Sequence, residues 1–165
     1  MNYFELYQIP LSFKPDQALV KKRFYQLSRK YHPDFYTNES ADEKEKVLEL
    51  SAMVNKAYQT FQHTDFLMKY ILQEKGLLVE EEKYQLSSDF LMEVMDINEQ
   101  LMDADSAEAK EALRDEINHL QNKIYAPIEA IMAAHQEDSL TQEELLQVKE
   151  YYFRKKYIDR ILAEY

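Results

Sequence analysis

The sequence predicts an all-α protein of two helical domains, and three features of its composition support that prediction. One glycine and four prolines among 165 residues are too few turn-forming residues for a structure rich in β-hairpins. Apolar residues recur at intervals of three and four, as on the buried face of a helix. The hydrophobic residues, 45% of the chain, are enough to form a packed core.

The same composition excludes several kinds of site. Glycine-rich phosphate loops need more than one glycine, which excludes dinucleotide-binding and P-loop enzymes. The chain has no cysteine and therefore no disulfide, thiolate zinc site or cysteine-ligated iron–sulfur cluster. The first residues lack the basic segment of a secretory signal, and no apolar run is long enough to span a membrane. We therefore expect a soluble cytoplasmic protein.

Charge is distributed unevenly along the chain. Residues 1–75 contain 11 basic and 10 acidic residues, a net charge of +1, whereas residues 76–165 contain 9 and 21, a net charge of −12. Such a contrast suggests two units with different partners. The single glycine, Gly76, follows an apolar run at this change and is typical of a helix C-terminus. The predicted division is a first domain at 1–76, a connector at 77–87 and an acidic domain at 88–165.

Two helices are predicted to form an antiparallel pair in the first domain. The first follows Asp16 as N-cap and ends before Pro33, since proline disfavours helical geometry in the residue before it. Its apolar stripe is Val20, Phe24, Leu27 and Tyr31. Its basic residues, on the other faces, are Lys21, Lys22, Arg23, Arg29 and Lys30. The second helix has an apolar face of Val47, Leu50, Val54, Ala57, Tyr58 and Phe61, and a polar loop around residues 37–40 joins the pair.

The loop between these helices opens with His32-Pro33-Asp34. Proline fixes the backbone, and histidine and aspartate together present a donor and a carboxylate acceptor to another protein. The basic helix face would steer an acidic partner towards this loop. Spacing alone favours a simpler interpretation, a turn beside an ordinary solvated helix face.

The acidic domain is predicted to be a three-helix bundle, although the heptad-like spacing also suits a coiled coil. Ser88, Ser106 and the Thr141/Glu144 pair are the expected caps, and Pro127 should kink or divide the middle helix. The apolar stripes of the three helices are Phe90, Val94, Ile97 and Leu101; then Leu113, Ile117, Leu120, Ile124, Ile128 and Ile131; and then Leu145, Val148, Tyr152, Ile158 and Leu162.

The first and third helices of this domain have more apolar residues than their stripes require. The surplus residues are Leu91, Met92, Met95 and Met102 on the first helix and Leu146, Phe153 and Tyr157 on the third. One interpretation is that both surplus faces are buried. The other is an exposed docking patch, for which methionine is well suited, with Asp96 and Glu99 as a charged rim.

Catalytic and metal sites have little support. The four histidines lack metal-binding spacing, and the segment from Asp103 lacks the glycine and the final glutamate of a calcium loop. Glu80, Glu81 and Glu82 form a charge run in the connector, with nothing expected to desolvate them. A net charge of −11 argues against nucleic acid. We expect a non-enzymatic protein with no metal, cofactor, nucleic acid or membrane partner.

His32-Pro33-Asp34 stands between a basic helix and a helix containing Val54-Asn55-Lys56-Ala57-Tyr58, and this order resembles a J-domain. The whole chain is similar to the HscB-type co-chaperones of iron–sulfur cluster assembly, through its opening residues 2–7, residues 89–93 and residues 156–159. The resemblance implies two partners. One is a DnaK-type (HscA-like) chaperone, whose ATPase the J-domain stimulates, and the other is an IscU-like cluster scaffold protein, bound by the acidic domain.

The resemblance also implies roles for particular residues. The chaperone-binding residues would be His32, Pro33, Asp34, Lys21, Lys22, Arg23, Arg29 and Lys30. The scaffold-binding residues would be Leu91, Met92, Met95, Asp96, Glu99 and Tyr157. The alternatives are a J-domain protein with a different client and a helical assembly subunit without a chaperone link.

The chain departs from the family pattern at a few positions. Phe35 stands where a basic residue is common, Thr64 where a proline often occurs, Gln8 where a small residue occurs and Met95 where leucine occurs. The cysteine-rich N-terminal extension of eukaryotic relatives is absent, which favours a bacterial protein.

Overall fold

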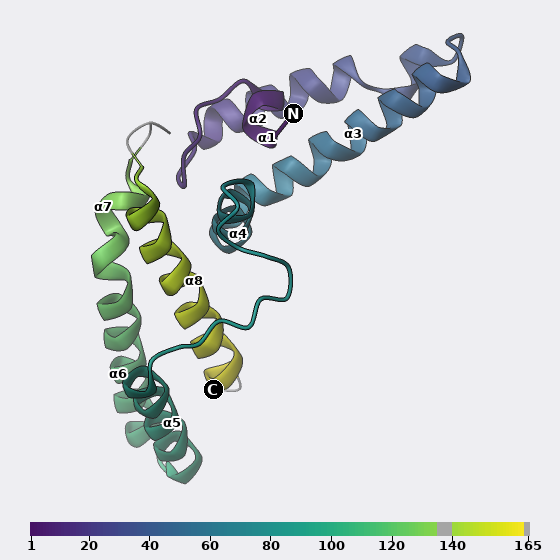
Figure 1. Cartoon of the computed structure of the whole chain (residues 1–165). Helices are drawn as coiled ribbons and strands as arrows, with labels where there is room; N and C mark the ends of the chain where they lie inside the picture. Colours follow the sequence, from purple (N-terminus) through teal and green to yellow (C-terminus); the bar gives the residue numbers. More distant parts are fainter. Residues whose placement is uncertain (135–139, 164–165) are drawn as a thin grey trace. The chain divides into compact units, whose positions relative to one another are not determined.

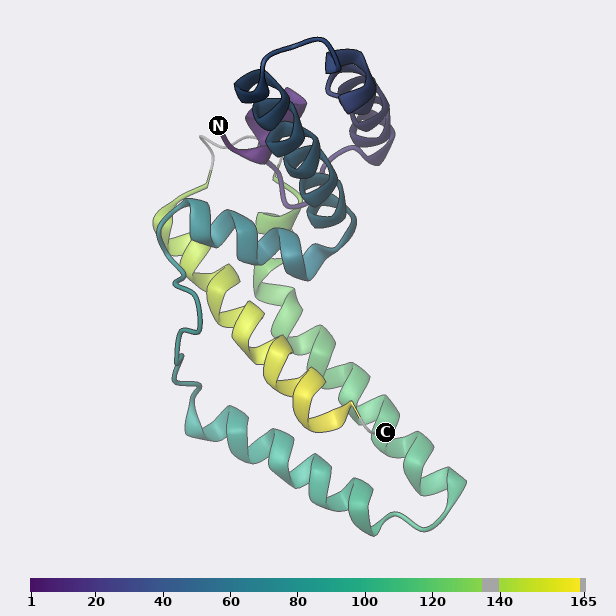
Figure 2. The same cartoon turned by 90° about the vertical axis from the view of Figure 1, so that its right-hand side faces the viewer.

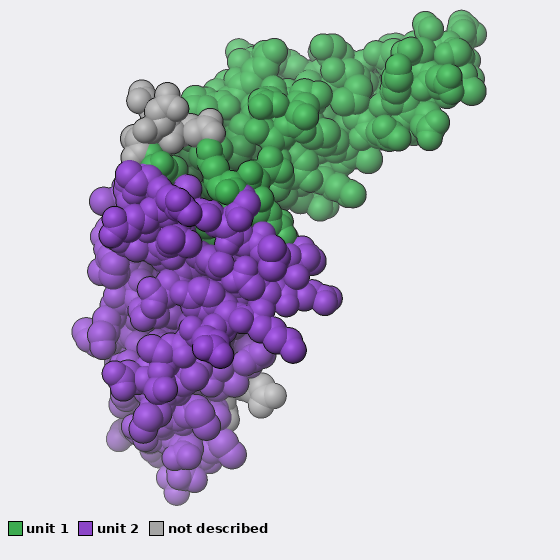
Figure 3. All heavy atoms as spheres, viewed as in Figure 1, with its two compact units in different colours: residues 1–75, 132–140 green, residues 76–131, 141–165 purple. Residues whose placement is uncertain are grey.

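The computed structural model describes residues 1–134 and 140–163, and within them every regular element is helical, which confirms the all-α class (Figure 1). The chain divides into two compact units, coloured separately in Figure 3. Unit 1 comprises residues 1–75 and 132–140, and unit 2 comprises residues 76–131 and 141–165.

Unit 1 is built around an antiparallel helix pair, as the sequence predicts. Its elements are α1 (Tyr3–Tyr7), α2 (Gln17–Lys30), the 3-10 turn η1 (Pro33–Tyr36), α3 (Ala41–Gln62) and α4 (Thr64–Glu74). Helices α2 and α3 lie side by side, and α1 packs against both of them (Figures 1 and 2). Helix α4 packs on α3. The turn η1 therefore lies at the end where α2 leads into α3.

Local chemistry explains where these helices begin and end. The Asp16 carboxylate accepts from the backbone N–H groups of Ala18 and Leu19 at 3.0 and 3.3 Å, which confirms it as the N-cap of α2. Lys75 is the C-cap of α4, and Gly76 follows it with φ +72°, a left-handed conformation that favours glycine.

The apolar stripe of α2 is buried unevenly. Val20 has no exposed surface, whereas Phe24, Leu27 and Tyr31 are only half-buried. Phe24 stacks on Tyr58 of α3 with ring centroids 4.2 Å apart. The end of the pair that carries η1 is thus held by partly solvated contacts.

Unit 2 contains the predicted three-helix bundle. Its helices are α5 (Ser88–Asp103), α6 (Ala107–Tyr125) and α8 (Gln142–Leu162), and each packs on the other two (Figure 2). Pro127 lies in the 3-10 turn η2 (Ala126–Ile128), which interrupts the helical path before α7 (Glu129–Met132), as predicted. The buried core comprises Phe90, Val94, Ile97, Leu101, Leu113, Leu120, Ile124, Ile158 and Leu162.

The caps of the bundle agree with the sequence except at α5. Ser106 caps α6, and Thr141 and Glu144 form a complete capping box. The prediction of Ser88 as N-cap of α5 is wrong by one residue, because the Ser87 hydroxyl accepts from the Phe90 N–H at 3.3 Å.

The segment predicted as a connector is fastened to α8 within unit 2. The Glu82 carboxylate lies 2.7 Å from the Lys149 ammonium, and the Tyr84 ring stacks on Phe153 at 4.7 Å. Lys149 lowers the pKa of Glu82 by donating a hydrogen bond to its carboxylate. The expectation that nothing desolvates this charge run is therefore wrong for Glu82, whose side chain is 20% exposed.

Candidate protein-binding sites

The His-Pro-Asp motif forms the start of η1 and is held by local hydrogen bonds. His32 is the N-cap, and its Nδ1 accepts from the Asp34 N–H at 3.3 Å. Pro33 occupies the first turn, where its missing N–H costs nothing. The Tyr36 hydroxyl donates to the Lys30 carbonyl at 2.7 Å and ties η1 to the end of α2. The motif is thus held by hydrogen bonds between local side chains and the backbone, and its side chains remain exposed.

This geometry defines what the motif presents to solvent. His32 Nδ1 lies 3.6 Å from an Asp34 carboxylate oxygen, and the two side chains are 53% and 85% exposed. Because Nδ1 accepts the Asp34 amide hydrogen, the hydrogen of a neutral imidazole is on Nε2. The motif therefore offers one N–H donor and one carboxylate acceptor, a pair suited to binding a protein surface.

The predicted basic residues of α2 differ in their availability. Lys21, Lys22, Arg29 and Lys30 are exposed. Arg23 is half-buried, and its Nη1 donates to Gln26 Oε1 at 3.2 Å. The four exposed residues are therefore better placed than Arg23 to meet a partner.

A shallow hollow of about 390 Å³ adjoins the motif. Most of the surface exposed in the hollow belongs to apolar atoms. The lining residues are Tyr25, Ser28, Arg29, His32, Asp34 and Phe35. The sequence patterns do not single out Tyr25 and Ser28. An available signal was the position of Tyr25, an aromatic residue about 140° away from Val20 and so outside the apolar stripe of α2.

The surplus apolar face of α5 is largely exposed. Met92, Met95 and Met102 are 67%, 54% and 68% exposed, and Leu91 is half-buried. The interpretation that this face is buried is wrong for the three methionines. They leave a flexible, polarizable surface of the kind that suits protein docking.

The remaining predicted scaffold-binding residues surround this face or lie near its start. Glu99 and Asp96 are exposed, and the Asp96 carboxylate accepts from the Gln100 amide at 3.4 Å. Tyr157, on α8, is half-buried, with its ring 6.1 Å from that of Phe90 and 5.3 Å from the Arg160 guanidinium.

The surplus face of α8 is only partly available. Leu146 is 44% exposed, whereas Phe153 is half-buried and covered by Tyr84 of the connector segment. The sequence did not predict this cover, because the connector has no helical period from which its contacts could be inferred.

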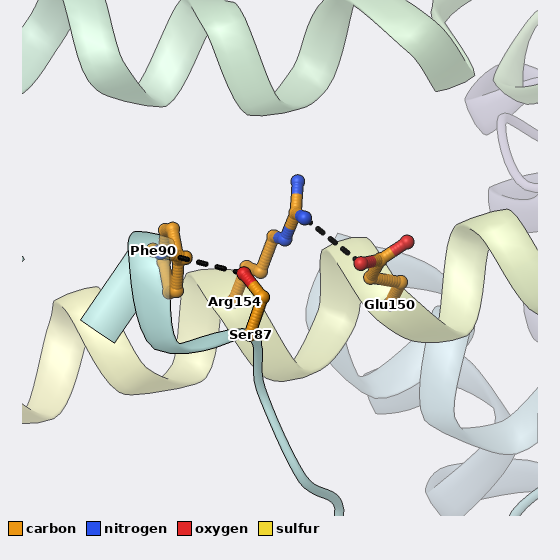
Figure 4. A network of polar contacts seen from close by, with 4 residues as sticks. All are labelled: Ser87, Phe90, Glu150 and Arg154. Atoms are coloured by element: carbon orange, nitrogen blue, oxygen red, sulfur yellow. Dashed lines mark hydrogen bonds and ion pairs between the residues drawn. The ribbon is translucent and has the colours of Figure 1, made fainter. Parts of the chain in front are cut away.

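One cation–π contact joins the start of α5 to α8, whereas the two hydrogen bonds drawn in Figure 4 each lie within one of these segments. The Arg154 guanidinium lies 5.3 Å from the Phe90 ring centroid, and its Nη2 is 2.8 Å from Glu150 Oε1. Ser87 caps the helix at the same place. Leu91 and Met92 are therefore presented from a fixed helix end, which lowers the entropy cost of binding.

Neither a cluster of metal-binding side chains nor a membrane-spanning helix is found among the described residues. Among residues 1–134 and 140–163, no group of three His, Asp or Glu side chains could hold a metal ion. His32, His63 and His119 are exposed, and His135 lies outside the described residues. In the same part of the chain no helix combines the length and apolarity needed to cross a bilayer.

An exposed His-Pro-Asp turn between antiparallel helices, followed in the chain by an acidic three-helix bundle, defines the class of J-domain co-chaperones. A co-chaperone HscB homologue of Vibrio campbellii is 35% identical over 117 residues, which are 70% of this chain and 68% of the relative. The chain belongs to the HscB family of co-chaperones. It is therefore a co-chaperone, and the role of its family is iron–sulfur cluster assembly.

Other comparisons agree with this membership. The family model described as the HSCB C-terminal oligomerisation domain matches residues 86–165. The iron–sulfur cluster co-chaperone HscB of Mus musculus is 34% identical over 92% of this chain and 64% of its own length. The crystal structure of human HscB has a TM-score of 0.75 at 28% identity and covers 99% of this chain and 80% of its own. HscB from Vibrio cholerae has a TM-score of 0.65 at 26% identity, covering 99% and 96%.

Proposed function

We propose that the chain links an IscU-like iron–sulfur cluster scaffold protein to a DnaK-type (HscA-like) chaperone and stimulates the ATPase of that chaperone. Residues 1–76 would act as the J-domain and residues 88–165 as the scaffold-binding domain. No step of this function requires a catalytic group of the chain itself. The proposed place of action is the bacterial cytoplasm.

The observation that carries the proposal is the exposed His-Pro-Asp turn at the end of the basic helix α2. Its donor and acceptor protrude, and exposed Arg29 and Lys30 immediately precede it. This charge pattern suits an acidic surface on the chaperone, where it would mainly raise the association rate.

The second half of the proposal depends on the exposed methionine face of α5. An apolar, adaptable surface with Asp96 and Glu99 beside it fits a protein client rather than a small molecule. Holding both partners on one chain raises the effective concentration of the scaffold at the chaperone, so that modest affinity at each site is sufficient.

The test compares His32→Gln with His63→Gln in the full chain. We expect His32→Gln to abolish stimulation of a purified HscA-type chaperone ATPase, because a flexible amide replaces the rigid imidazole that accepts from the Asp34 N–H at Nδ1 and presents its donor from Nε2. His63 is also exposed but lies at the other end of α3, about 33 Å along a helix of 22 residues. His63→Gln should stimulate normally, and circular dichroism should show both variants folded. Normal stimulation by His32→Gln would remove the J-domain role from this turn.

A further inference from the structure

Two exposed aromatic residues flank the His-Pro-Asp turn and lie outside the proposed set of chaperone-binding residues. Tyr25 on α2 is 57% exposed and Phe35 in η1 is 71% exposed. The Phe35 ring lies edge-on to the His32 imidazole, with centroids 6.0 Å apart. Neighbouring large apolar side chains that are exposed to solvent lower the solubility of a protein. Two of them beside one motif therefore suggest a binding surface.

Both residues line the same hollow. Its volume of about 390 Å³ has room for one large aliphatic or aromatic side chain, and its lining is mostly apolar although it includes Arg29, His32 and Asp34. The hollow is therefore continuous with the proposed chaperone-binding motif. A partner that contacts His32 and Asp34 would bring one of its own side chains to this place.

The surrounding charges indicate what kind of side chain enters. Exposed Arg29 borders the hollow and exposed Lys30 follows it on α2, so a neighbouring carboxylate on the partner would be favoured. Nucleic acid bases also stack on aromatic rings, but the 85% exposed Asp34 carboxylate in the same hollow repels phosphate. The chemistry points to an acidic protein surface with one protruding apolar residue.

We propose that Tyr25 and Phe35 form an aromatic clamp that holds an apolar side chain presented beside a carboxylate by the DnaK-type chaperone. This inference rests on the proposed function and makes the clamp a determinant of which chaperone the protein selects. Phe35 occupies the position directly after the motif, where a basic residue would offer a charge in place of an apolar contact.

The clamp is tested by the concentration of full chain that gives half-maximal stimulation of a purified HscA-type chaperone ATPase. Tyr25→Ala and Phe35→Ala should each raise it about 5- to 30-fold, the effect of losing one apolar anchor. Maximal stimulation should not change, since His32, Pro33 and Asp34 are intact. The matched control is Phe66→Ala on α4, which removes an aromatic ring that is also 57% exposed in unit 1. It should behave as the unsubstituted chain.

Two further measurements separate an apolar contact from an electrostatic one. The loss caused by Phe35→Ala should be the same at low and high salt, whereas the loss caused by Lys22→Ala should shrink as salt screens the charge. Phe35→Leu should retain most of the affinity, and Phe35→Lys should lose as much as Phe35→Ala. Stronger stimulation by Phe35→Lys would overturn the clamp.

The remaining outcomes distinguish the clamp from the function on which it rests. If the Tyr25 and Phe35 variants behave normally while His32→Gln is inactive, the clamp is refuted and the proposed function stands. If the unsubstituted chain does not stimulate the chaperone, both are refuted. If the two variants instead change the sedimentation of the chain by itself, a second copy occupies the hollow, and the inference is again wrong.

Discussion

Met92 and Met102 provide a matched pair for testing where a scaffold protein binds. Both are methionines on the surplus face of α5, and they are 67% and 68% exposed. They lie ten residues apart, or about 15 Å along the helix axis. Only Met92 belongs to the positions that the family resemblance assigns to the scaffold. Met92→Ala and Met102→Ala therefore change the same chemistry at two places.

The expected cost of Met92→Ala follows from its exposure. Complete burial of a methionine side chain is worth about 1.5–3 kcal/mol relative to leaving it exposed. Because Met92 is 67% exposed in the free chain, docking would bury about two thirds of that surface, worth about 1–2 kcal/mol. Met92→Ala should then weaken binding about 5- to 30-fold. Met102→Ala should change it less than about twofold.

The measurement is a calorimetric titration of each full-length variant with a purified IscU-like scaffold protein. Helical content by circular dichroism is the control, and we expect no loss because both side chains point to solvent and alanine favours helix. Equal losses in the two variants would show that the contact extends along the whole face. No loss for Met92→Ala would refute the placement of the scaffold on the start of α5.

Three further predictions concern the stability of unit 2. Glu82→Gln should lower the free energy of unfolding by about 1 kcal/mol at pH 7. Since the pKa of folded Glu82 is lowered, the stability difference between the unsubstituted chain and Glu82→Gln should be largest above about pH 4.5 and disappear as the pH falls through the lowered pKa. Urea unfolding of both proteins at pH 7 and pH 3 measures this difference. Equal stability differences at the two pH values would contradict the prediction. Thr141→Ala removes half of a capping box and should lower the free energy of unfolding by about 1 kcal/mol in the same assay. The control is Gln142→Ala, which leaves both capping side chains in place. Ile158→Ala should cost about 2–5 kcal/mol, because Ile158 is 1% exposed within the bundle core; a loss below 1 kcal/mol would mean that the core collapses around the cavity.

The helices were predictable because their signals are local. Asp16, Ser106 and the Thr141/Glu144 pair each cap the helix that the sequence assigns to them, and Pro127 interrupts the middle helix. A cap depends on a side chain and a backbone amide two or three residues away, so no tertiary information is needed. The one-residue error at Ser88 reflects the same chemistry, since two adjacent serines can both serve.

The contacts of segments without a period could not be predicted. Tyr84 stacks on Phe153, and Glu82 pairs with Lys149, yet more than sixty residues separate the partners along the chain. An irregular segment gives no helical face, so the sequence does not show which of its side chains will meet α8. The sequence pattern of α8 therefore gives no indication that the connector covers Phe153.

Solvent exposure in the structure differs between residues that the sequence pattern does not distinguish. The surplus apolar residues of α5 and α8 have the same pattern, but the methionines of α5 stay open while Phe153 is covered. The reason lies in the neighbours of each helix: Phe90 and Arg154 fix the start of α5 from its core side and leave its outer side free. A docking face needs this combination of a rigid inner side and an exposed outer side. A rigid helix loses little conformational entropy on binding, and an exposed apolar face contributes the free energy of burying its whole surface. The amphipathic pattern alone contains neither condition, and the packing of α5 supplies both.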